Sequence, residues 1–315
     1  MKSDQTSRVL CACMMMAVCS WGTTVHGQTK RELSRLVKSY RSKVTDIDVS
    51  WTYLHETLAE DPEGRPRRPI PKMTQRIRQR GAMFLKDSLS WRAGSKDPIH
   101  FLTAYDGEKL ITCDVDRKSV TITPGDARTP SGNWIYQTLK WPQKPPRSPF
   151  DDLAKLIESE RTTVLPDRET IYGVETVVLD WAGWEKIWLD IVHGGIIRKT
   201  ETRQSVGGPL LRRTEIPKLH DINGVFLPAQ IVKTGFASAK NPKKLWNTPV
   251  RRSTITIPKE TLKINTGLTK DAFAFEFPPG SHVHDDVTGT NYIVGPVTDR
   301  RTNDEDKPST GDAPS

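Results

Sequence analysis

Cysteine is scarce in this sequence. Only four of its 315 residues are cysteine, and Cys11, Cys13 and Cys19 all lie near the N-terminus. A chain cleaved after them keeps Cys113 alone, so it has no internal disulfide and must be stabilised by its buried core. Cys113 itself lies in an apolar, strand-like run, which favours a small buried side chain over a reactive thiol.

The sequence also lacks an apolar run long enough to span a bilayer, which takes about 20 residues. Val9–Trp21 is an apolar run with the length of a signal-peptide core. The basic residues Lys2 and Arg8 come before it. Val25–Gly27 then offers a small-residue cleavage site. We therefore predict a signal peptide at residues 1–27 and a periplasmic or extracellular mature protein.

Two other interpretations of the N-terminus stay open. The apolar segment would act as an uncleaved membrane anchor if no peptidase cut it before Gln28. Lipid attachment is a weaker alternative, because Cys13 has no apolar stretch of useful length before it and Cys19 follows the bulky Val18.

Acidic residues are fewer than basic ones, with 38 Asp and Glu against 47 Lys and Arg. The formal net charge is +9, and removal of Lys2, Asp4 and Arg8 with the signal peptide leaves +8. Such a protein can meet an anionic membrane surface or an acidic envelope protein, although this charge also serves ordinary solubility. A loop rich in Pro, Arg and Gly at residues 60–72 contains the candidates for an anionic partner, which are Arg65, Arg67 and Arg68.

Recognisable catalytic motifs are missing as well. The sequence has no Gly-x-Ser-x-Gly elbow, no phosphate-binding loop, no dinucleotide fingerprint and no His-Glu-x-x-His. His282 and His284 stand beside Asp285 and Asp286, but no distant ligand pair completes a metal site. We predict no catalytic residues, no metal and no cofactor, and no binding of nucleic acid.

The periodicity predicts two helices and many strands. Thr29 and Glu32 form a capping box before an apolar stripe at helical spacing, and Ser148-Pro149 opens a second helix. Short strand-like runs separated by turn residues fill most of the remaining chain. They are 47–53, 73–85, the residues around Trp91, 99–105, 110–114, 119–123, 171–181, 184–192, 196–204, 210–219, 226–234, 251–257 and 262–265.

The order is therefore helix, meander, helix, meander. Because the loops between consecutive strands are short, the strands should pair antiparallel. We predict a mainly β (α+β) protein, with a large curved antiparallel sheet or incomplete β-barrel and two helices packed on its concave face. The domain would span residues 28–297, followed by a disordered polar tail at 298–315.

Four motifs in this order resemble the LolA/LolB-like superfamily of periplasmic outer-membrane lipoprotein carriers. The resemblance spans roughly residues 29 to 290. The motifs are the hairpin Asp106-Gly107-Glu108-Lys109-Leu110, the strand Ile187-Trp188-Leu189-Asp190 with Gly194-Gly195 after it, the turn Asn223-Gly224 leading to Pro228, and the closing segment from Phe273 through Pro278 and Gly280 to Asp285.

This resemblance implies an incomplete antiparallel barrel, lidded by helices, whose apolar cavity holds acyl chains. It transfers no particular residue, and the Pro-rich insert and polar tail depart from a small carrier. Aromatic residues of this sequence that would either fill the core or line such a cavity are Trp51, Tyr53, Trp91, Trp184 and Trp188.

The leading hypothesis is an exported, non-enzymatic protein that holds a lipid or a lipoprotein acyl chain. Transfer of each methylene from water into such a cavity is worth about 0.8 kcal/mol, so no chemistry is needed. One alternative is a structural or protein-interaction module of the cell envelope with a filled cavity. A second alternative is an exported hydrolase.

Overall fold

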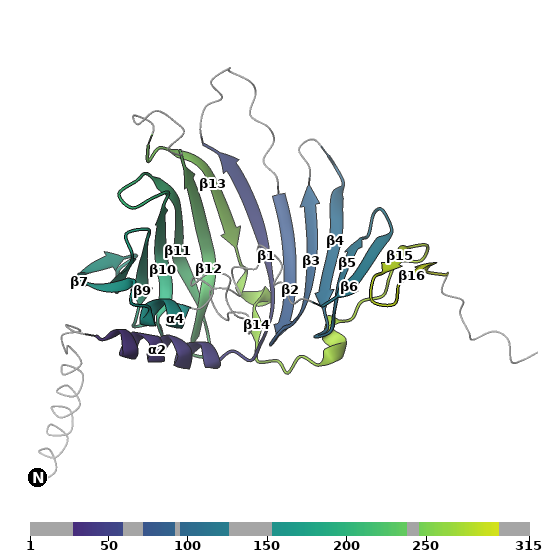
Figure 1. The fold of residues 1–315 in the computed structure, drawn as a ribbon, viewed down its shortest axis with the longest axis horizontal. Coiled ribbons are helices and arrows are strands. Elements are labelled where there is room, and N and C mark those ends of the chain that lie inside the picture. Colours follow the sequence, from purple (N-terminus) through teal and green to yellow (C-terminus); the bar gives the residue numbers. More distant parts are fainter. Residues whose placement is uncertain (1–27, 59–71, 92–94, 126–152, 238–245, 296–315) are drawn as a thin grey trace, which may run out of the picture.

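The computed structural model describes residues 28–58, 72–91, 95–125, 153–237 and 246–295. In these residues the chain is mainly β, with one large sheet that does not close and two α-helices (Figure 1). The predicted fold class is therefore confirmed. The predicted signal peptide, the arginines of the 60–72 loop, the start of the second helix and the polar tail lie outside the described residues.

Two meanders meet in the middle of the sheet. The first runs outward from the centre as β1 to β6, and the second returns inward as β7 to β13, so that β13 pairs with β1. Strands of the first meander are β1 (Asp46–Thr57), β2 (Lys72–Arg80), β3 (Met83–Trp91), β4 (Pro98–Tyr105), β5 (Lys109–Asp114) and β6 (Ser119–Pro124). Those of the second are β7 (Thr162–Ile171), β8 (Val174–Trp181), β9 (Glu185–Asp190), β10 (Ile196–Arg203), β11 (Leu210–Ile222), β12 (Val225–Phe236) and β13 (Pro249–Thr256).

The C-terminal part of the chain then crosses to the far side of the first meander. After β14 (Lys263–Ile264), which pairs with β1, and the short 3-10 helices η4 (Lys259–Thr261) and η5 (Lys270–Phe273), the strand β15 (His282–Asp285) joins β6. This pair is parallel, whereas the hairpins of the two meanders and the central β1–β13 pair are antiparallel. The strand β16 (Thr290–Ile293) ends the sheet on that side.

The helix α2 (Lys30–Ser42) begins at the predicted capping box. The Thr29 backbone N–H donates to Glu32 Oε2 at 2.8 Å, and the Glu32 N–H donates back to Thr29 Oγ1 at 3.3 Å. Its stripe buries Leu33, Val37 and Tyr40. The helix α4 (Leu153–Glu158) packs beside it, and Ser34 of α2 donates to Glu158 at 2.5 Å.

Both helices pack on the same face of the sheet, which we call the helix face. Leu33 and Val37 share a buried cluster with Leu179 and Leu189, and Tyr40 shares another with Trp51. Since side chains alternate along each strand and paired residues point to the same side, the strand register extends this face across the whole sheet.

The far end of the first meander buries its other face instead. Leu102, Cys113, Val120 and Val283 are successive register partners on that opposite face. They pack with Phe275 and Phe277 of the segment that follows η5. The core therefore changes sides along the sheet. The helix face of β1 to β4 is buried at residues such as Trp51 and Ile77 and becomes partly exposed towards the other end of these strands.

Candidate functional site on the helix face

Beyond the helices, partly exposed apolar side chains cross the helix face of β1, β2 and β4. Tyr53 pairs with Met73, Met73 with Ser90 and Ser90 with Ile99, so these side chains form one row. Phe101, which is 42% exposed, lies two residues along β4 on the same face. We call Tyr53, Met73, Ile99 and Phe101 the apolar strip.

Buried residues of the same face lie beside the strip. Trp51, only 2% exposed, belongs to the core beneath α2 on the same face of β1. Gln75 and Ser88 follow it in register, are buried, and hydrogen-bond to each other at 3.2 Å. Their mutual hydrogen bond satisfies part of the polar surface that burial removes from water.

The next row of the helix face is polar. Lys233 pairs with Ser253, and Ser253 pairs with His55. The buried Ser253 hydroxyl accepts from Tyr53 Oη at 2.8 Å and lies 2.9 Å from His55 Nδ1. The Tyr53 and His55 rings stack at 4° with centroids 6.4 Å apart. These contacts fix the Tyr53 ring at the border between the apolar strip and the polar row.

Basic residues continue the polar side of this face. Gly235, two residues beyond Lys233, stands in register between Arg212 and Arg251. A β-carbon at Gly235 would lie 2.5 Å from Arg251 Nε, so the arginine side chain passes over the glycine. We call Lys233, Arg212 and Arg251 the basic cluster. Burial, and then the nearby Arg212 charge, lower the pKa of Lys233 to about 8.

Among the described residues, the carboxyl group of Glu185 borders the basic cluster. Glu185 pairs with Thr202, and Thr202 pairs with Arg212, along the same face. Burial raises the pKa of Glu185 to about 7, although the Thr202 hydroxyl at 3.4 Å and the Arg212 charge oppose the rise. At neutral pH this group is therefore only partly ionised.

The structure brings together only two of the five aromatic candidates, Trp51 and Tyr53. Trp184 lies in the β8–β9 turn and is 40% exposed. Trp91, at the end of β3, points to the opposite face, where Lys72 Nζ lies 5.6 Å from its ring centroid.

Trp188 also lies on the opposite face, inside a charged network. Its indole N–H donates to Glu169 Oε2 at 2.8 Å, and Lys199 Nζ lies 4.1 Å from its ring centroid. Lys199 in turn pairs with Glu201 at 3.0 Å, as does Arg213 at 2.9 Å. That Trp51, Tyr53, Trp91, Trp184 and Trp188 contact a ligand stays a prediction.

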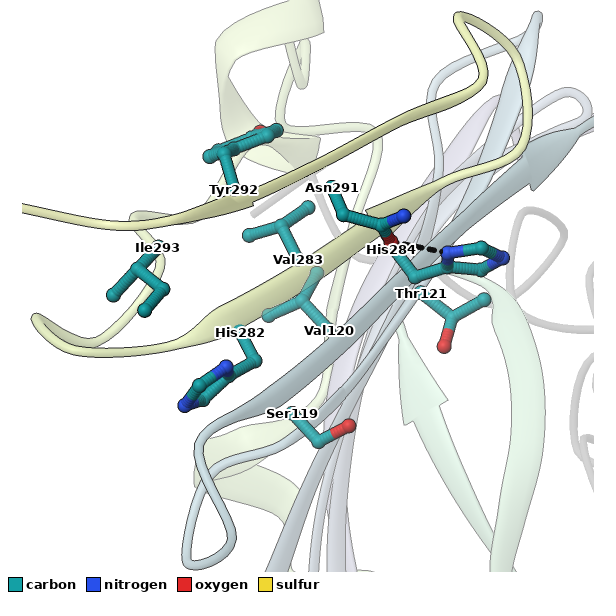
Figure 2. A pocket seen from close by; sticks show the side chains of 9 residues that line it. All are labelled: Ser119, Val120, Thr121, His282, Val283, His284, Asn291, Tyr292 and Ile293. Carbon is teal, nitrogen blue, oxygen red and sulfur yellow. Dashed lines mark hydrogen bonds between the residues drawn. The ribbon is translucent and has the colours of Figure 1, made fainter.

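A shallow pocket of about 310 Å³ lies where β15 and β16 meet β6 (Figure 2). Both His282 and His284 line it, but Figure 2 shows their rings pointing away from each other. His284 already contacts Asn291 and Asp286, at 2.5 and 2.7 Å. Within the described ranges, no group of three or more His, Cys, Asp or Glu side chains is placed to hold a metal.

The helices of the described residues are too short or too polar to cross a membrane. The arginine candidates Arg65, Arg67 and Arg68 lie outside the described residues, so an anionic partner at that loop stays a prediction.

Sequence reasoning missed Met73, Ile99, Phe101 and the basic cluster. Alternation along each strand was visible in the sequence and gives the face of every residue within that strand. Alternation does not give the register between strands. The cluster depends on the register of β11, β12 and β13, and its place next to Tyr53 depends on the β1–β13 pair.

No family model and no curated protein sequence matches the chain. Solved structures similar to it include a DUF1329 family protein from Desulfovibrio piger, with 10% identity over 78% of this chain and 95% of that one, and a TM-score of 0.45. They also include a LolA superfamily protein from Nitrosomonas europaea, with 12% identity over 80% of this chain and 100% of that one, and a TM-score of 0.43. The neighbours thus include the superfamily that the motif order resembles, but likeness at this level says nothing about what this chain binds.

Proposed function

We propose that this chain is an exported, non-enzymatic binding protein that holds the acyl chain of a lipid or lipoprotein on its helix face. The observation that supports the proposal is the apolar strip, which is partly exposed beside the core of α2. Signal-peptide cleavage near Gln28 would release the protein into the periplasm or the extracellular space.

The strip suits an acyl chain because it presents apolar side chains on β1, β2 and β4 of one face, with Ser90 of β3 between Met73 and Ile99. Tyr53 and Met73 are adjacent in register, and Ile99 follows across β3. A fully buried methylene contributes about 0.8 kcal/mol, so ten methylenes on this partly exposed strip would supply at most roughly 8 kcal/mol before the cost of ordering the chain. That amount suffices for a carrier that must also release its cargo.

The described residues support binding better than hydrolysis. Asp190 accepts from His193 Nδ1 at 2.6 Å, an arrangement that orients an imidazole in many hydrolases. Here, however, the His193 ring packs edge-on against Phe226, with centroids 4.4 Å apart. The pair closes the β9–β10 turn beneath α2 and is placed to stabilise the fold.

A displacement assay with a fluorescent fatty acid tests the proposal. Phe101 and Leu54 are both 42% exposed, but they lie on the helix face and the opposite face. We expect Phe101→Asn to weaken probe binding about tenfold, and the matched control Leu54→Asn to leave it unchanged. The proposal fails if the wild-type protein binds no probe, or if both variants bind as it does.

A second candidate function is a protein-interaction module, and the terminal strand β16 favours it. All four residues of this strand are exposed, including Tyr292 at 46% and Ile293 at 61%. An exposed terminal strand can pair with an extended segment of another protein. The N–H of Ile293 points away from β15, since that of Val294 bonds to Ser281. Ile293→Pro would therefore weaken such pairing while leaving fatty-acid binding intact, which separates the two functions.

A further inference from the structure

We infer that the apolar tip of the second meander docks on the surface of an anionic lipid bilayer. The apolar tip consists of three exposed side chains at two neighbouring hairpin turns, which are Trp184 of the β8–β9 turn, Val206 of the β10–β11 turn and Leu211 just after that turn. This surface is separate from the apolar strip, so docking does not depend on the proposed binding of an acyl chain.

The apolar tip presents large apolar side chains to water. Trp184 is 40% exposed, Val206 is 63% exposed and Leu211 is 37% exposed. A single exposed apolar side chain is ordinary, but several at one place indicate an interaction surface. Tryptophan is enriched where proteins meet the membrane interface, because its ring is apolar while its N–H still bonds to water or headgroups.

The two turns contact each other. A β-carbon at Gly183 would lie 3.0 Å from Val206 Cγ1, so the valine side chain lies against the backbone of the neighbouring turn. The Arg203 N–H, at the end of β10, donates to the Trp184 carbonyl at 2.8 Å. Trp184 and Val206 therefore belong to one surface, although they come from different hairpins.

Hydrogen bonds order both turns before any partner binds. In the β8–β9 turn, the Trp184 N–H donates to the Trp181 carbonyl at 2.9 Å. In the β10–β11 turn, the Gly208 N–H donates to the Ser205 carbonyl at 2.9 Å, and Arg203 Nη1 donates to the Gly208 carbonyl at 2.9 Å. Docking would order little additional backbone, which lowers its cost in conformational entropy.

Basic residues lie beside the apolar tip. Arg161 is exposed, and its carbonyl accepts a backbone N–H of the first turn at 2.9 Å. Arg203 adjoins both turns, and Arg212 is exposed at the start of β11. Of the acidic neighbours, Asp180 accepts a backbone N–H of the first turn at 2.7 Å, and burial raises the pKa of Glu185 to about 7. Apolar side chains with arginines around them, in a chain of positive net charge, complement an anionic bilayer.

The apolar tip lies at the same end of the sheet as the apolar strip. Strands β8 to β13 reverse direction one after another and β13 pairs antiparallel with β1, so both turns lie at the end where β1 finishes. Tyr53 and Met73 lie toward that end, beyond the core residue Trp51. Docking of the apolar tip would therefore bring the strip close to the bilayer.

Sedimentation with vesicles tests the docking. The chain from Gln28 onward is the form that signal-peptide cleavage would release, and it lacks the apolar segment that would itself bind lipid. We expect it to bind vesicles that mix phosphatidylglycerol with phosphatidylcholine about tenfold more tightly than vesicles of phosphatidylcholine alone. Equal binding to both vesicles would overturn the assignment to an anionic surface. Binding to neither, with self-association that needs Val206, would replace the bilayer by a second copy of the chain.

Two valines supply matched variants. Val206 lies at the apolar tip, whereas Val192, which is 72% exposed, lies in the β9–β10 turn at the opposite end of these strands. We expect Val206→Asp to weaken binding to the anionic vesicles about tenfold, because it puts a carboxylate where an apolar side chain would meet lipid. Val192→Asp changes the net charge equally and should weaken binding less than about twofold. Equal losses would reduce the effect to overall charge and overturn the inference.

Two exposed arginines separate local from overall charge in the same way. Arg161 lies beside the apolar tip, and Arg80 ends β2 at the opposite end of the sheet. We expect Arg161→Gln to weaken binding to the anionic vesicles about fivefold, the contribution of one basic residue at such a surface, and Arg80→Gln to leave it nearly unchanged. A larger loss for Arg80→Gln would mean that another surface docks.

Trp184 reports the contact directly. Trp184→Phe keeps an aromatic side chain, so this variant should still bind the anionic vesicles. Lipids brominated on their acyl chains quench a tryptophan that lies in the bilayer, so they should quench the wild-type protein and have little effect on the variant. Equal quenching of the two proteins would mean that a different tryptophan meets the bilayer, and would overturn the apolar tip as the docking surface.

Discussion

Tyr40 of α2 lies against Gly194 in the β9–β10 turn, so closely that a β-carbon on the glycine would overlap the ring. The same tyrosine donates its hydroxyl hydrogen to the carbonyl of Phe226 at 2.7 Å. One residue of the helix thus contacts the β9–β10 turn and the beginning of β12. This contact sets how α2 lies on the helix face, and with it the boundary between the covered core and the apolar strip.

We expect Gly194→Ala to destabilise the protein by about 3 kcal/mol. The backbone at Gly194 has φ +89°, a left-handed conformation that costs an L-residue about 1–2 kcal/mol, and overlap with Tyr40 adds to it. Gly224→Ala is the control, because Gly224 has φ +76° but no atom within 4 Å of the place that an added methyl group would occupy. Denaturant unfolding would contradict the prediction if the two variants lost the same stability.

The helix α2 could be predicted from the sequence because its signals are local. The capping box at Thr29 and Glu32 and the stripe through Leu33, Val37 and Tyr40 lie within a few residues of one another. By contrast, Ile171–Trp181 was predicted as one strand and this is wrong at its start. The chain turns at Tyr172 and Gly173. Tyr172 has φ 52°, a left-handed conformation that is uncommon for tyrosine, so the residue type does not predict the turn.

Long-range pairing explains what else the sequence did not reveal. Short loops correctly predicted antiparallel hairpins, but β15 pairs parallel with β6 after the chain has crossed from the other side of the sheet. The change of core from one face to the other depends on that crossing, since Phe275 and Phe277 belong to the returning segment. The alternation of apolar and polar residues along the strand indicates which face Tyr53 lies on. It does not indicate that Ser253 is its neighbour.

Glu185 should make the protein less stable as the pH rises from about 4.5 to 7. Its pKa is about 7 in the folded protein against 4.5 when unfolded, so the folded state holds the proton over this range. The contribution is fully present below pH 4.5 and lost above 7. We expect Glu185→Gln to gain about 1–3 kcal/mol relative to wild type at pH 8, and little at pH 4.

Thermal unfolding between pH 4 and 8 measures the effect of Glu185. The control is Glu175→Gln, which changes an exposed carboxylate on β8. A gain in stability for Glu185→Gln that does not grow with pH would contradict the prediction.

Cys113 should be inert in the folded protein. It is 1% exposed, and burial followed by the neighbouring Asp114 charge raises the pKa of its thiol. Both effects deplete the thiolate that reacts with alkylating agents. Peptide mapping after iodoacetamide treatment should find Cys113 unmodified in buffer and modified in denaturant, and modification in buffer would show that this part of the core opens.

Asp46 should anchor the C-terminal return to the first strand. Its carboxylate accepts from the Thr266 N–H at 2.8 Å, the Thr266 hydroxyl at 3.0 Å and the Gly267 N–H at 3.0 Å. Burial acts to raise the pKa of Asp46, but these hydrogen bonds outweigh it and hold the pKa below its usual value. The folded state therefore gains stability from the ionised carboxyl above the unfolded pKa, and loses it as the pH falls through the folded one.

Asp46→Ala removes these three contacts, together with the one from the Thr45 hydroxyl at 3.3 Å, and leaves two backbone N–H groups without an acceptor. It should therefore cost about 2–4 kcal/mol at pH 7. Asp271→Ala changes an exposed carboxylate in the same returning segment and should cost less than about 0.5 kcal/mol. Hydrogen exchange should then accelerate in residues 263–285 of the Asp46 variant, because β15 reaches β6 only through this segment. Unchanged exchange there, with a global loss of stability, would mean that Asp46 stabilises β1 alone and that the far core is held by Phe275 and Phe277.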